Sequence, residues 1–236
     1  MSGVMLADPA LVGNELTESG DRIFDPQFWQ SRSQLAAVDG GRGAAWFVGP
    51  SGHWVLRHYR RGGFAARISR DLYWWNGEAA VRSFAEWRLL ELLFSRGLPV
   101  PRPVAAGYRR YGLGYRCDLI TQRLSNTQSL TQVLKSAALQ EESWAGVAAV
   151  IAQLHRNGVD HADLNAHNIL LDDEGRVSVI DFDRSRLRTP GGWQRGNLQR
   201  LHRSLLKVCR GFPPDRFSRL QWAWFLDAYR SAMTCA

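Results

Sequence analysis

Lysine is nearly missing from this chain of 236 residues, since only Lys135 and Lys207 stand among its 30 basic residues and all the others are arginine. Against 22 acidic residues, the formal net charge is +8. High-GC coding would produce such an arginine bias without functional meaning. The functional interpretation is an anionic partner, because guanidinium groups pair bidentately with phosphate and carboxylate. Nucleic acid, an anionic membrane surface and a phosphorylated substrate all fit, and charge does not choose among them.

Long apolar runs and cysteines are also scarce. No stretch of about 18 or more apolar residues is present, so we expect no transmembrane helix. The first ten residues lack the basic start and apolar centre of a secretory signal, and none is expected. Cys117, Cys209 and Cys235 are odd in number and have no metal-ligand spacing. The reducing cytoplasm is therefore the expected compartment.

The stretch from residue 161 to residue 183 carries the strongest chemical signal. Two short apolar runs separated by a polar turn predict a β-hairpin over residues 169–180. Asp163 and Asn168 lie on the loop before this hairpin, and Asp181 follows its second strand. We expect their side chains to converge at one end of the hairpin, where their oxygens suit a hard divalent ion such as Mg²⁺. An acidic turn between ordinary strands is the alternative, and the ordered helix–loop–hairpin context argues against it.

The spacing of these residues resembles the catalytic loop of protein-kinase-like enzymes. His161, Asp163 and Asn168 fit the pattern H-x-D-x-x-x-x-N, and Asp181 opens an Asp-Phe-Asp where many kinases have Asp-Phe-Gly. The resemblance implies that Asp163 accepts the proton of the attacking hydroxyl. It also implies that Asn168 and Asp181 hold Mg²⁺ on the phosphates of ATP.

A strand predicted over residues 53–59 holds the main departure from that pattern. In kinase-like enzymes this strand carries a phosphate-binding lysine, with a small apolar residue two positions before it over the adenine. No lysine precedes Lys135 in this chain. Arg57 is the only basic residue of the strand at the matching place, and Val55 takes the place over the adenine.

A helix predicted over residues 76–94 supplies the partner of Arg57. Its apolar residues recur at helical spacing, and it ends before a proline-rich segment that cannot continue it. In kinase-like enzymes this helix carries a glutamate that pairs with the basic residue of the preceding strand. Glu86 is the favoured candidate because of its mid-helix position, and Glu91 is the competing one. Either glutamate would otherwise be an ordinary solvated helix residue.

Two further segments carry weaker signals. Gly41 and Gly43 lie in a glycine-rich turn ahead of the first strand, where kinase-like folds place backbone N–H groups over nucleotide phosphates, although a plain loop also fits. Residues 60–75 are rich in arginine and aromatic residues. They are either a surface loop or a surface for an anionic, partly apolar substrate at a membrane.

Strand and helix signals separate along the chain. Alternating patterns predict about five strands and one intervening helix before the middle of the chain, and helical periodicity dominates afterwards. We therefore expect an α+β, two-lobed protein-kinase-like fold that forms one catalytic domain. Its expected parts are an N-terminal extension over residues 1–38, a small β-rich N-lobe over 39–124 and a mainly helical C-lobe over 125–236.

Several motifs, taken in order, resemble the 3-deoxy-D-manno-octulosonic acid (Kdo) kinase family of lipopolysaccharide core kinases. They span about residues 25–210 and lie at residues 55–63, 71–75, 97–103, 161–168 and 181–184. The resemblance implies ATP-dependent phosphorylation of the 4-hydroxyl of Kdo on Kdo-lipid IVA, an anionic glycolipid. It also implies peripheral contact with the cytoplasmic face of the Gram-negative inner membrane, with no nucleic acid and no stable protein partner.

Three alternatives stay open at this point. Another small-molecule kinase, of the aminoglycoside or heptose type, would share the catalytic loop but not the arginine- and aromatic-rich insert. A nucleotide-binding pseudokinase would explain the missing lysine, but it would not need Asp163, Asn168 and Asp181 together. A nucleic-acid-binding protein would explain the charge but not the catalytic loop.

Overall fold

The structure is a computed structural model that describes residues 3–39, 45–60 and 71–234. The chain divides into two units. Unit 1 comprises Met1–Leu92 and Pro101–Leu124, and unit 2 comprises Leu93–Val100 and Ser125–Ala236. Within the described ranges, no helix is both long and apolar enough to span a membrane.

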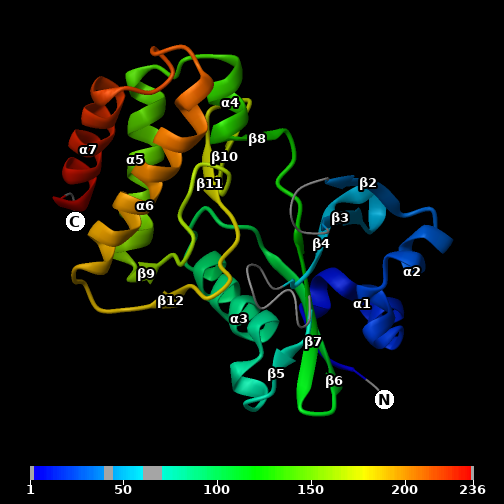
Figure 1. Cartoon of the computed structure of the whole chain (residues 1–236). Helices are drawn as coiled ribbons and strands as arrows, with labels where there is room; N and C mark the ends of the chain where they lie inside the picture. The colour runs from blue at the N-terminus through cyan, green and yellow to red at the C-terminus, as the bar shows by residue number, and fades with distance from the viewer. Residues whose placement is uncertain (1–2, 40–44, 61–70, 235–236) are drawn as a thin grey trace. The chain divides into compact units, whose positions relative to one another are not determined.

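Unit 1 is built on an antiparallel sheet in the order β1-β6-β7-β4-β3-β2, with β5 paired to β7 (Figure 1). The strands of this sheet are β1 (Val4–Ala7), β2 (Leu35–Asp39), β3 (Ala45–Val48), β4 (Trp54–His58), β5 (Tyr73–Trp74), β6 (Pro103–Tyr111) and β7 (Gly114–Gln122). The helices that begin in this unit are α1 (Pro9–Glu18), α2 (Pro26–Ser31) and α3 (Arg82–Ser95), with short 3₁₀ turns over Gly20–Phe24, Pro50–Gly52 and Glu78–Ala80. Helix α3 begins later than the pattern predicts, because Val81 before it is extended.

The N-terminal segment is more ordered than the single short helix that the sequence predicts. Strand β1 pairs with β6, with Val4 opposite Tyr108 and Ala7 opposite Ala105. Trp29 of α2 is fully buried and its indole N–H donates to the carbonyl of Ile23 at 2.7 Å. Both residues pack in one apolar cluster with Trp54 and Leu56 of β4. Residues before 39 therefore contribute both a strand and part of the core of unit 1.

Alternation along β4 decides which residues face this core. Trp54 and Leu56 are buried in the cluster, whereas Val55 and Arg57 are partly exposed. Because successive side chains of a strand point to opposite faces, Val55 and Arg57 share the other face of the sheet. The pairing of β4 with β3 and β7 fixes that register, with Arg57 opposite Ala45 and Leu119.

Unit 2 is mainly helical, and α5 packs against α7 (Figure 1). Its helices are α4 (Leu130–Ser136), α5 (Glu141–Arg156), α6 (Trp193–Val208) and α7 (Arg219–Thr234), with one 3₁₀ turn over Cys209–Gly211. Its strands are β8 (Thr127–Ser129), β9 (Val159–Asp160), β10 (Ile169–Asp172), β11 (Val177–Val179) and β12 (Arg186–Leu187). With a strand-rich unit and a helix-rich unit, the predicted α+β class is confirmed.

Local sequence explains how α5 leads into the loop that follows it. The buried face of α5 carries Val147, Ile151 and Leu154, as the predicted helical spacing requires. Gly158 then adopts a φ of +76°, a left-handed conformation that glycine reaches without strain and that ends the helix. Its carbonyl accepts from the N–H of Arg188 at 2.8 Å, which extends the β9–β12 pairing.

Candidate active site

The predicted hairpin is confirmed, and it brings together the two ends of the proposed catalytic motif. Strands β10 and β11 pair with Ile169 opposite Val179. The ladder continues for one more step, because the N–H of Ile180 donates to the carbonyl of Asn168 at 2.9 Å. Asp181, with a φ of +65°, follows directly. Asn168 and Asp181 therefore leave the same end of the hairpin.

Asn168 is also tied to the loop that carries Asp163. Its side-chain amide donates to the backbone carbonyl of Asp163 at 3.0 Å, and the amide of Asn165 donates to the same carbonyl at 3.1 Å. Asp163 is exposed. Asp163 is therefore an exposed residue whose backbone carbonyl is held by two side-chain amides.

His161 connects the loop to the far side of the hairpin. It is buried, its Nε2 lies 3.1 Å from the carbonyl of Ile180, and its Nδ1 lies 3.2 Å from the N–H of Asp163. A carbonyl requires a donor and an N–H requires an acceptor, so these partners assign the neutral tautomer protonated at Nε2. Burial lowers the pKa of His161, which agrees with a neutral ring. The ring thus positions both Asp163 and the residue before Asp181 without carrying charge.

Helix α6 supports this loop through residues that the sequence analysis missed. Asn197 is 2% exposed. Its side-chain oxygen accepts from the N–H of His161 at 3.0 Å, and its amide donates to Asp160 at 2.9 Å. The hydroxyl of Ser204 accepts from the N–H of Ala166 at 3.1 Å. The only sequence signal for Asn197 is its place four residues before Leu201, on the buried row of the predicted helix.

Asp160, just before the loop, is held as a carboxylate by several donors. Burial raises its pKa, but hydrogen bonds from Arg188 and Asn197 and the charge of Arg186 outweigh burial, and the net shift of the pKa is downward. Arg188 lies 3.1 Å from the Asp160 carboxylate and Arg186 lies 3.6 Å from it. Asp160 is therefore an ionised anchor of the β9–β12 pair at neutral pH.

In unit 1, the structure pairs Arg57 with Glu86. The Nη2 of Arg57 lies 2.5 Å from the Oε2 of Glu86, and the Glu86 residue is 3% exposed. Glu91 is exposed on α3. The pairing preferred from the sequence is therefore the one present.

Tyr59 is a third member of this group, and the sequence analysis gave it no role. Its hydroxyl donates to Glu86, and Arg57 Nη2 lies 3.3 Å from that hydroxyl oxygen. The guanidinium carbon of Arg57 also lies 4.8 Å from the centre of the Tyr59 ring, within cation–π range. The sequence did contain a signal for Tyr59. It lies two residues after Arg57 and four after Val55, and residues at this spacing share one face of a strand.

The predicted site residues fall into three groups: those in unit 2, those in unit 1 and those outside the described residues. Asp163, Asn168 and Asp181 lie on one loop and hairpin of unit 2, while Val55, Arg57 and Glu86 lie in unit 1. Gly41 and Gly43 lie outside the described residues, as does most of the arginine- and aromatic-rich insert.

The donor set of the hairpin end suits a hard cation. No group of three or more His, Cys, Asp or Glu side chains with metal-binding geometry occurs among the residues that the structure describes. Asn168 and Asp181 form a different kind of set, an amide and a carboxylate oxygen, with the remaining ligands left to phosphates and water, as is usual for Mg²⁺. The amide nitrogen of Asn168 donates to the Asp163 carbonyl, so its side-chain oxygen would be the atom that ligates a cation.

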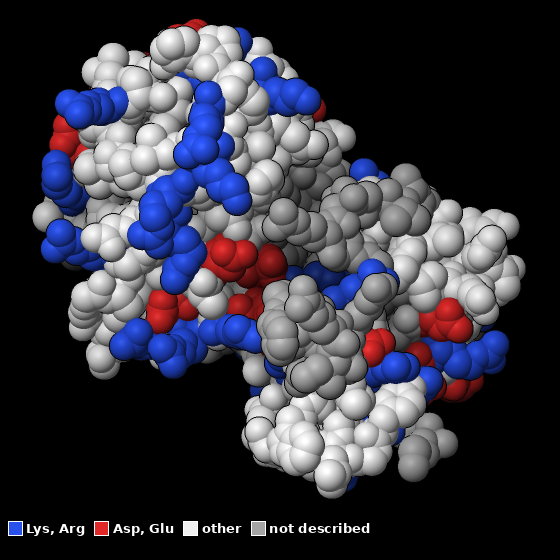
Figure 2. Space-filling view, in the orientation of Figure 1, with Lys and Arg blue, Asp and Glu red and all other residues white. Residues whose placement is uncertain are grey.

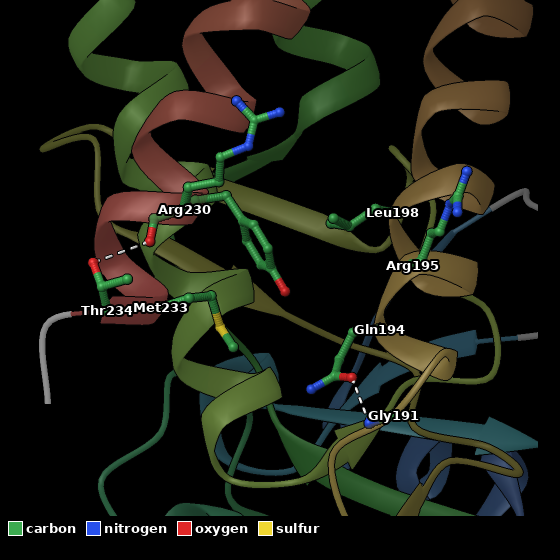
Figure 3. A pocket seen from close by; sticks show the side chains of 8 residues that line it. Gly191, Gln194, Arg195, Leu198, Arg230, Met233 and Thr234 are labelled. Carbon is green, nitrogen blue, oxygen red and sulfur yellow. Dashed lines mark hydrogen bonds between the residues drawn. The ribbon is translucent and has the colours of Figure 1, made fainter.

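A separate hollow lies between the beginning of α6 and the end of α7. It has a volume of about 500 Å³ and includes Leu198, Met233, Arg195 and Arg230 in its lining (Figure 3). Figure 3 shows Gln194 at its edge, where the side-chain oxygen accepts from the N–H of Gly191 at 2.8 Å. Its lining includes none of the catalytic-motif residues, so this hollow is distinct from the candidate active site.

Comparison with known families shows to which protein family this chain belongs. A family model described as lipopolysaccharide kinase (Kdo/WaaP) family matches residues 26–229. The chain belongs to this family. The family resemblance inferred from the motifs is thereby confirmed, and with it the kinase character of the fold.

Curated relatives in the family are similar over most of the chain. A 3-deoxy-D-manno-octulosonic acid kinase of Xanthomonas campestris pv. campestris is 53% identical over 195 residues, which cover 82% of this chain and 78% of the relative. A protein of the same description from Xylella fastidiosa is 50% identical over 188 residues, covering 79% of this chain and 75% of the relative. Among solved structures, vaccinia related kinase 3 aligns with a TM-score of 0.46 and 19% identity, covering 84% of this chain and 69% of that chain.

Proposed function

We propose that this protein is an ATP-dependent kinase that phosphorylates the 4-hydroxyl of Kdo on Kdo-lipid IVA during lipopolysaccharide inner-core biosynthesis. The observation that carries this proposal is the agreement of two facts. The chain is 53% identical to a Kdo kinase over 82% of its length. The loop and hairpin that bear Asp163, Asn168 and Asp181 are joined by two hydrogen bonds, from the Asn168 side chain to the Asp163 carbonyl and from the N–H of Ile180 to the Asn168 carbonyl.

In the proposed reaction, Asp163 acts on the acceptor hydroxyl. The sugar oxygen attacks the terminal phosphorus of ATP, a new oxygen–phosphorus bond forms, and the bond to ADP breaks. Asp163 accepts the proton that the hydroxyl loses. Its exposed position and anchored backbone support this role. Because phosphoryl transfer needs little covalent help from protein, the rest of the site positions groups and neutralises charge.

Nucleotide and metal binding complete the proposed site. Asn168 and Asp181 would hold Mg²⁺, which would supply positive charge to neutralise the phosphates during transfer. Arg57 would bind phosphate in place of the usual lysine, and Glu86 would fix Arg57 through their 2.5 Å contact. Val55 would lie over the adenine, and the backbone at Gly41 and Gly43 would cover the phosphates.

The organisation and location of the protein are part of the same proposal. Residues 1–38 would be an extension, 39–124 the N-lobe and 125–236 the C-lobe of one catalytic domain. The enzyme would act on the cytoplasmic face of the inner membrane and contact that surface peripherally. Its net charge of +8 supports contact with anionic lipid.

Phosphate transfer from ATP by the purified protein with Mg²⁺ tests the proposal, with the product read by mass spectrometry. Kdo-lipid IVA should gain one phosphate, and lipid IVA without Kdo should gain none. The Asp163→Asn variant should be slower by about a thousandfold, the usual range for a lost general base. Asp173→Asn, which alters an exposed aspartate in the turn of the same hairpin, is the matched control. Nucleotide binding without transfer to Kdo-lipid IVA would show that the proposal is wrong.

A further inference from the structure

Helix α6 carries two adjoining rows of polar residues beside the catalytic loop. The first row, Asn197 and Ser204, hydrogen-bonds the backbone of the loop at His161 and Ala166. The second row is Arg200, Arg203 and Lys207. These three residues are spaced three and four apart, so their side chains lie on one face of the helix. The first row fixes the position of the second relative to Asp163.

Arg200 joins the basic row directly to the loop. Its Nη1 lies 3.3 Å from the carbonyl oxygen of His161, two residues before Asp163. A guanidinium has five N–H donors, so one bond to a carbonyl leaves most of its capacity for another acceptor. At 1.5 Å of rise per residue, the row extends about 10 Å along the helix from Arg200 to Lys207. It thus runs alongside the catalytic loop from His161 to Ala166, which Ser204 contacts, and continues beyond it to Lys207.

The row lacks the carboxylates that balance other basic residues of this protein. Within the part of the chain that the structure describes, Arg200, Arg203 and Lys207 have no carboxylate within 4.0 Å, whereas Arg57 and Arg188 each have one. Arg203 and Lys207 are exposed. Figure 2 shows a run of basic side chains on the face of unit 2 that α6 forms. Like charges held together without counter-ions attract anions and raise their local concentration.

We infer that Arg200, Arg203 and Lys207 bind the phosphate groups of the glycolipid acceptor and thereby hold its Kdo hydroxyl at Asp163. This inference rests on the proposed function. The disaccharide of a lipid A precursor is phosphorylated, and guanidinium and ammonium groups suit phosphate oxygens. Three cations spread over about 10 Å of helix can contact more than one anionic group, whereas the Kdo sugar offers a single carboxylate. We therefore assign the row to the phosphates rather than to the Kdo carboxylate.

The test is the double variant Arg203→Gln, Lys207→Gln, assayed with the acceptor dispersed in neutral detergent. Loss of two charge-assisted contacts should raise the KM for Kdo-lipid IVA about tenfold or more. The kcat and the KM for ATP should change less than about twofold, because uniform binding affects KM alone. With an enzymatically dephosphorylated acceptor, the variant and the unaltered protein should have the same KM.

The matched control is the double variant Lys135→Gln, Arg219→Gln. It removes the same charge from two exposed residues of unit 2, and Lys135, like Lys207, lies in the last turn of its helix. The KM of this control should equal that of the unaltered protein. An equal rise of KM in both double variants would indicate net charge alone and would overturn the inference.

Three further outcomes separate this inference from membrane binding by the same row and from failure of the proposed function. The first measurement is binding to phosphatidylglycerol vesicles that contain no acceptor. If Arg203→Gln, Lys207→Gln bound these vesicles about tenfold more weakly but kept an unchanged KM for the acceptor in detergent, the row would belong to the membrane surface and the inference would be overturned. Efficient transfer to Kdo-lipid IVA with an unchanged KM in the double variant would also overturn it while leaving the proposed function intact. Absence of transfer by the unaltered protein would instead mean that the proposed function has failed.

Discussion

Tyr59 and Arg57 share one oxygen of Glu86. The tyrosine hydroxyl and the Arg57 guanidinium both donate to Oε2 of this buried carboxylate. Burial raises the pKa of Tyr59 well above its usual value, so the hydroxyl keeps its proton and remains a donor. A buried carboxylate is costly unless it is paired and hydrogen-bonded, and Glu86 has both kinds of partner. The group of three therefore holds the arginine of β4 in one place.

Removing the Tyr59 hydroxyl should loosen this arrangement. We expect Tyr59→Phe to lower the free energy of unfolding by about 1–3 kcal/mol, because a buried charged acceptor loses a donor. We also expect the KM for ATP to rise severalfold with little change in kcat, since Arg57 would be positioned less well. Denaturant unfolding and steady-state kinetics check both. Tyr111→Phe, at an exposed position of β6, is the control, and an unchanged KM for ATP in Tyr59→Phe would contradict the positioning role.

Glu86 and Glu91 offer a sharper comparison on one helix. Glu86→Gln removes the charge that pairs with Arg57, and we expect kcat/KM for ATP to fall about tenfold or more, in line with the strength of charge-assisted contacts. Glu91→Gln changes an exposed residue and should leave kcat/KM unaltered. Kinetics at varied ATP concentration distinguish the two. Equal effects of the two substitutions would mean that the Arg57–Glu86 pair has no role in nucleotide binding.

Asn197 should matter for both folding and rate. Asn197→Ala leaves the N–H of His161 without its acceptor in a buried place and removes one donor from Asp160. We expect a loss of about 2–3 kcal/mol in the free energy of unfolding, the usual cost of unsatisfied buried polar groups. The kcat should fall as well, because the loop that carries Asp163 loses an anchor. Gln199→Ala, on an exposed position of α6, is the control for helix content.

Acidification should destabilise the protein through His155. This residue of α5 is buried against Trp193 and Tyr229, with its Nδ1 2.7 Å from the Tyr229 hydroxyl. Burial lowers its pKa from 6.5 to about 4. The unfolded chain therefore takes up a proton below pH 6.5 that the folded protein does not accept until the pH nears 4. Stability that is present above pH 6.5 is lost as the pH falls through this interval, by about 3 kcal/mol in total.

Denaturant unfolding at a series of pH values measures this effect. His155→Gln has no imidazole to titrate, so its stability should change less between pH 6.5 and pH 4 than that of the unaltered protein. The two proteins are compared by slope and not by absolute stability, because the substitution itself perturbs a buried site. Parallel slopes would show that His155 does not control the pH dependence.

Local sequence was sufficient for the features that depend on neighbours along the chain. The hairpin β10–β11 follows from two apolar runs around a polar turn. Once Ile169 pairs with Val179, the register of the two strands is fixed, and this register places Asn168 near Asp181 at the end of the hairpin. The spacing of Asp163 and Asn168 on one short loop likewise predicted their proximity. The α+β class and the family resemblance rest on patterns of this kind.

Tertiary structure alone decided the contacts between distant residues. Glu86 meets Arg57 and Glu91 does not, because residues five apart point to different sides of a helix and only packing decides which side faces β4. Tyr59 and Asn197 gained their roles in the same way, since their partners lie 27 and 36 residues away. The pairing of β1 with β6 is also long-range, and the sequence of β1 contains no sign of its partner. Sequence periodicity indicates which faces are apolar, but the hydrogen-bond partners of buried polar groups exist only once those faces have packed.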